Sequence, residues 1–204
     1  PSPGRALVRV ACLAALLLPT VVPALVPALV PALVPAQAVD ATTGERLLRL
    51  VSRADYKTLA AATCSDTGLA FAPYTRNLSA LHSTRLSRAA LARFSTSRQA
   101  IDWGREDGSG LPIRLRPMAY HRQFVYDLDY LHRATPLRLS AAQVLADVEL
   151  RALAAAFPQA EAVVYRFAGT PALGHKDRRE LILVGRPQAG GWCLEALAHD
   201  QDTV

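Results

Sequence analysis

The chain has 204 residues and a net charge of +6. Residues 1–38 resemble an export segment, and the remaining 166 suffice for one domain that buries a core without a dense disulfide network. Residues 1–38 hold two arginines and no acidic residue, so the rest carries a net charge of +4, almost all of its positive charge from arginine. The absence of a basic stripe interleaved with aromatic residues, or of a known module, argues against nucleic-acid binding.

The first 38 residues have the order of a secretory signal peptide. Arg5 and Arg9 form a basic start, VACLAALLLPTVV is an apolar run, and Ala36 and Ala38 in PAQA suit a signal peptidase. We expect cleavage after Ala38 and an extracytoplasmic location, either periplasmic or secreted. The VPAL repeat that precedes the cleavage site carries four prolines, which disfavour a continuous membrane helix. An uncleaved anchor with an extended proline-rich stalk is the alternative.

Helical periodicity starts soon after Val39. Thr42 and Glu45 have the spacing of a capping box, and the apolar residues that follow predict one helix from about 43 to 62. GLAFAPYT predicts a short strand, and STRLSRAALARF predicts a second helix. In IDWGREDGSGLPIRL, three glycines and a proline separate two apolar patches, which indicates a hairpin-like turn at 101–115.

Two further helices are predicted in the middle of the chain. Pro117 suits the first turn of one of them. Ser140 and Gln143 resemble another capping box, which opens a helix that runs through Phe157 and ends at Pro158.

After Pro158 the periodicity becomes that of strands. EAVVYRFAG, RELILVGRP and GWCLEALAHD are divided by turn-rich segments, as in an antiparallel meander. Helices first and strands later predict one α+β domain over residues 39–204, with the helices packed on one face of a curved antiparallel sheet. By fold-level analogy we expect an NTF2-like or cystatin-like arrangement.

Two cysteines, Cys64 and Cys193, follow the export segment. In an oxidising compartment they would close a long loop and stabilise the fold by several kcal/mol. The alternative is a pair of buried thiols.

Two groups of carboxylates are candidates for a site. Asp127 and Asp129 would point to one side of an extended backbone, where they could hold a cation or share a proton. The alternative is that they cap a helix end or pair with nearby arginines. In the last strand, alternation places Leu194, Ala196 and Ala198 on an apolar face and His199 on the opposite, mixed face, in a polar pocket or in solvent. Because no second histidine lies at ligand spacing, we expect neither a metal site nor a cofactor.

Four segments resemble a family of uncharacterised bacterial secreted proteins and lipoproteins that share a C-terminal domain of unknown function: FAPY at 71–74, WGREDGSGLPI at 103–113, AYHRQFVYDLDY at 119–130, and GWCLEALAHDQDTV at the end. The family pattern closes with a tryptophan where this chain has Asp202. The resemblance implies an extracytoplasmic domain and directs attention to Tyr126, Asp127, His199 and Asp200 as candidate ligand-binding residues.

Two functions remain open at this point. The first is a non-catalytic, envelope-associated binding or accessory domain. Its partner would be a small ligand, or an anionic envelope component contacted by Arg85, Arg88 and Arg93 or by Arg178 and Arg179. The second is a small hydrolase or isomerase with a cone-like pocket. Convergence of His199 and an aspartate in a deep apolar cavity would favour the enzyme, and an open surface would favour the binding domain.

Overall fold

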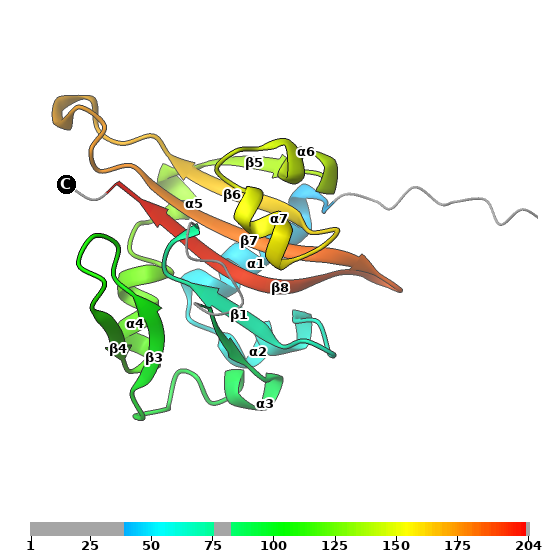
Figure 1. Cartoon of the computed structure of the whole chain (residues 1–204). Helices are drawn as coiled ribbons and strands as arrows, with labels where there is room; N and C mark the ends of the chain where they lie inside the picture. The colour runs from blue at the N-terminus through cyan, green and yellow to red at the C-terminus, as the bar shows by residue number, and fades with distance from the viewer. Residues whose placement is uncertain (1–38, 76–82, 203–204) are drawn as a thin grey trace, which may run out of the picture. The chain divides into compact units, whose positions relative to one another are not determined.

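The sheet that organises the fold is built from strands far apart in the sequence (Figure 1). The computed structural model describes residues 39–75 and 83–202, so the predicted signal peptide lies outside the described residues. In spatial order the six strands are β2 (Thr84–Leu86), β1 (Leu69–Ala72), β8 (Gly191–Gln201), β7 (Arg179–Gln188), β6 (Glu161–Phe167) and β5 (Thr135–Leu139). β1 pairs parallel with β8, and all the other neighbours in this sheet pair antiparallel. The predicted α+β class is confirmed, but the sheet is mixed rather than antiparallel. The NTF2-like or cystatin-like arrangement stays a prediction.

Elements pack on both faces of the sheet, whereas we expected helices on one. The first face is covered by α1 (Ala41–Ser52), α2 (Tyr56–Ala62), α3 (Arg88–Leu91), the hairpin of β3 (Ile101–Arg105) and β4 (Pro112–Leu115), α4 (Pro117–Phe124) and α5 (Tyr130–Arg133). The second is covered by α6 (Ala141–Ala146) and α7 (Arg151–Ala156). Leu181 and Leu183 of β7 enter the first core, while Ile182 and Val184 enter the second. Strands buried on both faces have continuous apolar runs, as β7 does.

The predicted helix over 43–62 is interrupted, and its first cap is a different residue. Asp40, not Thr42, caps α1 by accepting a hydrogen bond from the Thr43 amide. Ala54 then adopts a positive φ of 54°, and the Asp55 side chain caps α2. The left-handed residue followed by a new cap turns the chain, so two helices replace one.

The helix predicted from Ser140 to Phe157 is also divided in two. The capping box of Ser140 and Gln143 is present at the start of α6. The Asp147 side chain then accepts hydrogen bonds from the amides of Glu149 and Leu150, which offers the backbone an alternative to a continuing helix.

In the middle of the chain, some elements predicted from local sequence patterns are confirmed and others are not. The turn in 101–115 joins β3 and β4, and Pro117 is the first residue of α4. Thr84–Leu86, predicted as helix, instead pairs with β1 at the sheet edge. Neither α5 nor the edge strand β5 was predicted.

A β-bulge changes which residues of β8 share a face. Val184 pairs with Ala196, but the next residue, Gly185, pairs with Leu194, so Glu195 is an additional residue in the strand. Leu194 therefore packs in the first core, whereas Ala196 and Ala198 pack in the second. The prediction that these three residues share one face is wrong, because strict alternation assumes a strand without a bulge.

A disulfide connects α2 to the last strand. Cys64 follows α2, Cys193 lies in β8, and their Cα atoms are 5.0 Å apart. Both residues are fully buried. This geometry is consistent with the predicted bond and not with two separate thiols.

Candidate functional site

His199 is enclosed in the first core near the end of β8. Its exposed fraction is 0%, and Phe124 contacts the ring edge-on. Nδ1 lies 3.2 Å from the carbonyl oxygen of Pro73, and Nε2 lies 3.3 Å from Oδ2 of Asp127. Both nitrogens therefore face acceptors inside the protein. The solvent exposure considered for His199 does not occur, and the polar contacts hold its ring in place.

Asp127 is tied to three elements of the fold. Oδ1 accepts a hydrogen bond of 2.8 Å from the Tyr130 hydroxyl, and Oδ2 accepts one of 3.1 Å from Nε of Arg179, besides facing His199. Burial alone would raise the pKa of Asp127, but the hydrogen bonds from His199 and Tyr130 and the charge of Arg179 lower it below its ordinary value. Asp127 is thus held as a carboxylate with arginine and histidine partners.

Asp129 and Tyr126 belong to a separate, more exposed group. Oδ2 of Asp129 lies 2.7 Å from Nδ1 of His132, and Oδ1 accepts a hydrogen bond of 3.1 Å from the Tyr126 hydroxyl. Asp127 and Asp129 consequently have different partners and do not share a proton. Of the four candidate residues, only Asp127 and His199 come together.

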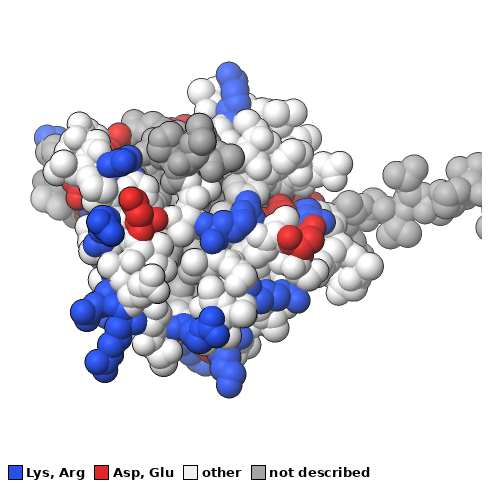
Figure 2. All heavy atoms as spheres, turned by 60° about the horizontal axis from the view of Figure 1, so that its bottom comes forward, with Lys and Arg blue, Asp and Glu red and all other residues white. Residues whose placement is uncertain are grey.

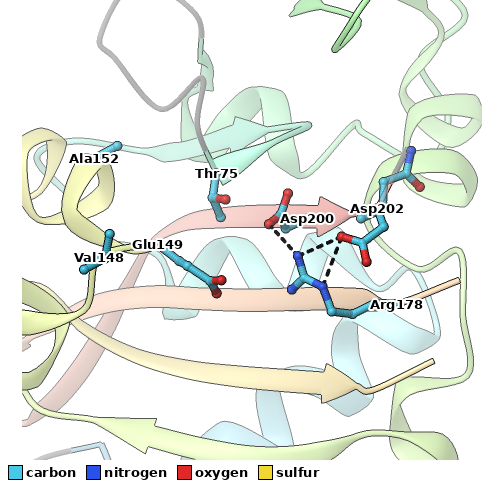
Figure 3. A pocket seen from close by; sticks show the side chains of 8 residues that line it. Thr75, Val148, Glu149, Ala152, Arg178, Asp200 and Asp202 are labelled. Carbon is cyan, nitrogen blue, oxygen red and sulfur yellow. Dashed lines mark hydrogen bonds and ion pairs between the residues drawn. The ribbon is translucent and has the colours of Figure 1, made fainter. Parts of the chain in front are cut away.

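Asp200 faces the opposite side of the sheet from His199, next to a hollow of about 570 Å³ (Figure 3). We call this hollow the Arg178 pocket, and its lining residues are Thr75, Val148, Glu149, Ala152, Arg178, Asp200, Gln201 and Asp202. Consecutive strand residues point to opposite faces, so the closing His199-Asp200 pair cannot form one site.

Arg178 neutralises a cluster of carboxylates beside this pocket. Its nitrogens lie 3.0 Å from Glu180, 3.4 Å from Asp200 and 3.1 Å from Asp202. Burial alone would lower the pKa of Arg178, but these carboxylates raise it above the ordinary value. Glu180 is only 2% exposed, and it also pairs with Arg166. Oδ1 of Asp200 is buried without a hydrogen-bond partner among the described residues, so this oxygen can still accept a hydrogen bond.

Glu180, a member of this cluster, was not among the site residues predicted from the sequence. Glu180 joins the cluster because it pairs directly with Asp200 across β7 and β8, a register that the structure shows. Arg178 and Arg179 were considered as contacts for an anionic partner, with a solvated surface as the alternative. Both are instead engaged within the fold, Arg178 with the cluster on the second face and Arg179 with Asp127.

A second charged feature is a surface with an excess of arginine. Figure 2 shows that basic side chains outnumber acidic ones on the side of the molecule that carries α2, α3 and the β3–β4 hairpin. Between positions 84 and 124 the chain has eight arginines and three acidic residues. We define the basic face as the exposed basic residues of these elements and their connections: Lys57, Arg85, Arg88, Arg93, Arg98, Arg105, Arg114 and Arg116.

Some arginines of the basic face form hydrogen bonds within the protein, and others do not. Arg85 donates to the Thr67 carbonyl oxygen, and Arg88 donates to that of Thr63. Within the described ranges, the side chains of Arg93, Arg98 and Arg114 have neither an ion pair nor a hydrogen bond. Their charges are therefore available to a partner.

Three further findings bear on function. In the described part of the chain, no helix has the length and apolar character needed to cross a membrane. The same residues contain no group of three or more His, Cys, Asp or Glu side chains placed to hold a metal ion. A scan against protein-family models and searches of curated proteins and solved structures found no match to this chain.

Proposed function

We propose that this chain is an exported, non-catalytic domain that associates with the bacterial envelope by binding anionic lipid headgroups through the basic face. The observation that carries the proposal is the group of exposed arginines without partners, including Arg93, Arg98 and Arg114. The signal-peptide pattern of residues 1–38 supports the export of the domain.

Elementary electrostatics supports a surface of this kind as a peripheral binding site. Each Lys or Arg near an anionic membrane contributes about 1 kcal/mol, and the attraction falls off within a Debye length. Arginine suits phosphate because its planar guanidinium donates two parallel hydrogen bonds. Several unpaired arginines on one surface would therefore bind an anionic membrane surface without a ligand pocket, and this binding would weaken as the salt concentration rises.

The enzyme alternative receives less support from the same geometry. His199 and Asp127 do converge, but the His199 ring is fully enclosed and its two nitrogens already face Asp127 and Pro73. A general base must reach a proton of the substrate, which an enclosed ring cannot do.

Vesicle sedimentation tests the proposal. Residues 39–204 should sediment with vesicles of phosphatidylglycerol and phosphatidylcholine at low salt, should remain in solution with phosphatidylcholine alone, and should be released at high salt. Replacing Arg93, Arg98 and Arg114 with glutamine should weaken binding at least tenfold, since about 1 kcal/mol is lost per arginine.

The matched control removes the same charge elsewhere. Arg46, Arg138 and Arg151 are also exposed, and they lie on α1, β5 and α7. Their replacement with glutamine should change binding less than twofold. Equal losses in the two triple variants would mean that net charge alone drives association. Binding to an isolated anionic polymer but not to vesicles would overturn the assignment to lipid.

A further inference from the structure

The first described residue, Val39, is anchored in the fold by its side chain and its backbone. The residue is 3% exposed and belongs to the first core. Its amide nitrogen donates a hydrogen bond of 3.0 Å to Oε2 of Glu161, in a buried position. Asp40, the next residue, caps α1, so the direction in which the chain enters the fold is determined here.

Glu161 is a buried carboxylate that lacks a cation. It begins β6, is 5% exposed, and forms no ion pair with any residue of the described ranges. Burial raises the pKa of Glu161, and the Val39 amide and Trp192 offset this only in part. Taking a carboxylate out of water is costly unless a positive charge accompanies it.

We propose that removal of residues 1–38 completes this site, because the new α-ammonium group of Val39 forms a buried ion pair with Glu161. The inference rests on the export proposed above. Two independent observations point to the nitrogen of Val39. Ala36 and Ala38 suit a signal peptidase that cuts before Val39, and the nitrogen of Val39 is the atom that faces Glu161.

The chemistry of processing supplies the missing charge. Water adds across the Ala38–Val39 amide: its oxygen bonds to the carbonyl carbon of Ala38, and the carbon–nitrogen bond breaks. The amine of Val39 takes up both protons that the water and the new carboxylic acid release, so Ala38 leaves as a carboxylate and Val39 becomes an ammonium. A neutral amide donor at 3.0 Å is thereby replaced by a cation with three N–H donors.

The test compares two proteins with defined starts, residues 39–204 and residues 36–204, each with the disulfide intact. Each protein contains every described residue of the two cores. In denaturant, the unfolding equilibrium constant of the protein that starts at Val39 should be at least tenfold smaller. In the Glu161→Gln background this ratio should fall below twofold.

A second measurement covers the case in which Glu161→Gln does not fold. The pKa of the Val39 amine, followed by NMR, should lie above the ordinary value of about 8, and the added stability should fade as the pH rises through that raised pKa. An unshifted amine, or a stability ratio that persists in Glu161→Gln, would overturn the ion pair. These proteins are made without export, whereas N-terminal sequencing of exported material tests the cleavage itself.

Discussion

Nε2 of His199 lies 3.3 Å from Oδ2 of Asp127, a residue 72 positions earlier in the chain. The contact joins the end of β8 to the segment between α4 and α5, and Arg179 of β7 donates to the same carboxylate oxygen. Histidine and aspartate at this distance occur in many active sites, but here the His199 ring is fully buried, and the partly buried carboxylate of Asp127 is already held by Tyr130 and Arg179. The pair is a polar clamp inside the first core.

Because the clamp is buried, His199→Ala should lower the free energy of unfolding by more than the loss of an exposed hydrogen bond would. The substitution removes a fully buried ring and leaves Oδ2 of Asp127 with one donor fewer, so we expect it to lower the free energy of unfolding by about 2–4 kcal/mol. Urea unfolding measures the change. His132→Ala is the control, because His132 is exposed and also pairs with an aspartate. Similar small losses in both variants would show that the clamp contributes little.

Features with short-range signals were predictable from the sequence, whereas features set by tertiary pairing were not. The β3–β4 turn, Pro117 at the start of α4 and the Ser140 capping box depend on neighbouring residues, and each was predicted. The parallel pairing of β1 with β8 joins segments far apart in the chain, and it turned a predicted antiparallel sheet into a mixed one.

The candidate site shows the same division. Sequence alternation correctly separates His199 from Ala198, but the bulge at Glu195 moves Leu194 to the face of His199. The sequence contains a signal for this bulge, because an isolated glycine inside a strand pattern, here Gly185, suggests a bulge or a close approach of another backbone. A Cβ at Gly185 would lie 2.1 Å from the carbonyl oxygen of Cys193, so glycine is needed at this position.

The buried histidine on α4 predicts a stability that depends on pH. Nδ1 of His121 lies 2.9 Å from the Tyr56 hydroxyl, and burial, with a smaller contribution from the Arg122 charge, lowers the pKa of His121 to about 4. The unfolded chain takes up this proton near pH 6.5, so the stability that the neutral ring contributes is present above 6.5 and is lost as the pH falls toward 4. The loss should approach about 3 kcal/mol.

Unfolding in urea at pH 7.5 and pH 5.0 measures this effect when the wild type is compared with His121→Gln. The glutamine can still bond to Tyr56 but does not titrate, so the difference between the two pH values should shrink. An identical pH dependence in both proteins would exclude His121 as the titrating group.

The disulfide predicts both a labelling pattern and a loss of stability. In residues 39–204, alkylation without reductant should label neither Cys64 nor Cys193, which are separated by 129 positions. Because a cross-link over so long a loop restricts the unfolded chain, reduction should lower the free energy of unfolding by about 2–5 kcal/mol and lower the melting temperature. A Cys64→Ser and Cys193→Ser double variant should match the reduced protein. Labelling of the untreated protein would contradict the bond.

Arg178 should be the most sensitive residue of the pocket that Asp200 lines. Glu180 and Asp200 are paired across β7 and β8, both are buried, and Arg178 contacts the two carboxylates. Arg178→Gln would leave these like charges close together with Arg166 as the one remaining cation among the described residues, so we expect a loss of about 2–4 kcal/mol in the free energy of unfolding, measured in urea at pH 7. Lys176→Gln is the control, since Lys176 is exposed in the same connection and the same unit charge is removed. A loss as small as that of Lys176→Gln would mean that Arg178 contributes little to holding the two carboxylates together.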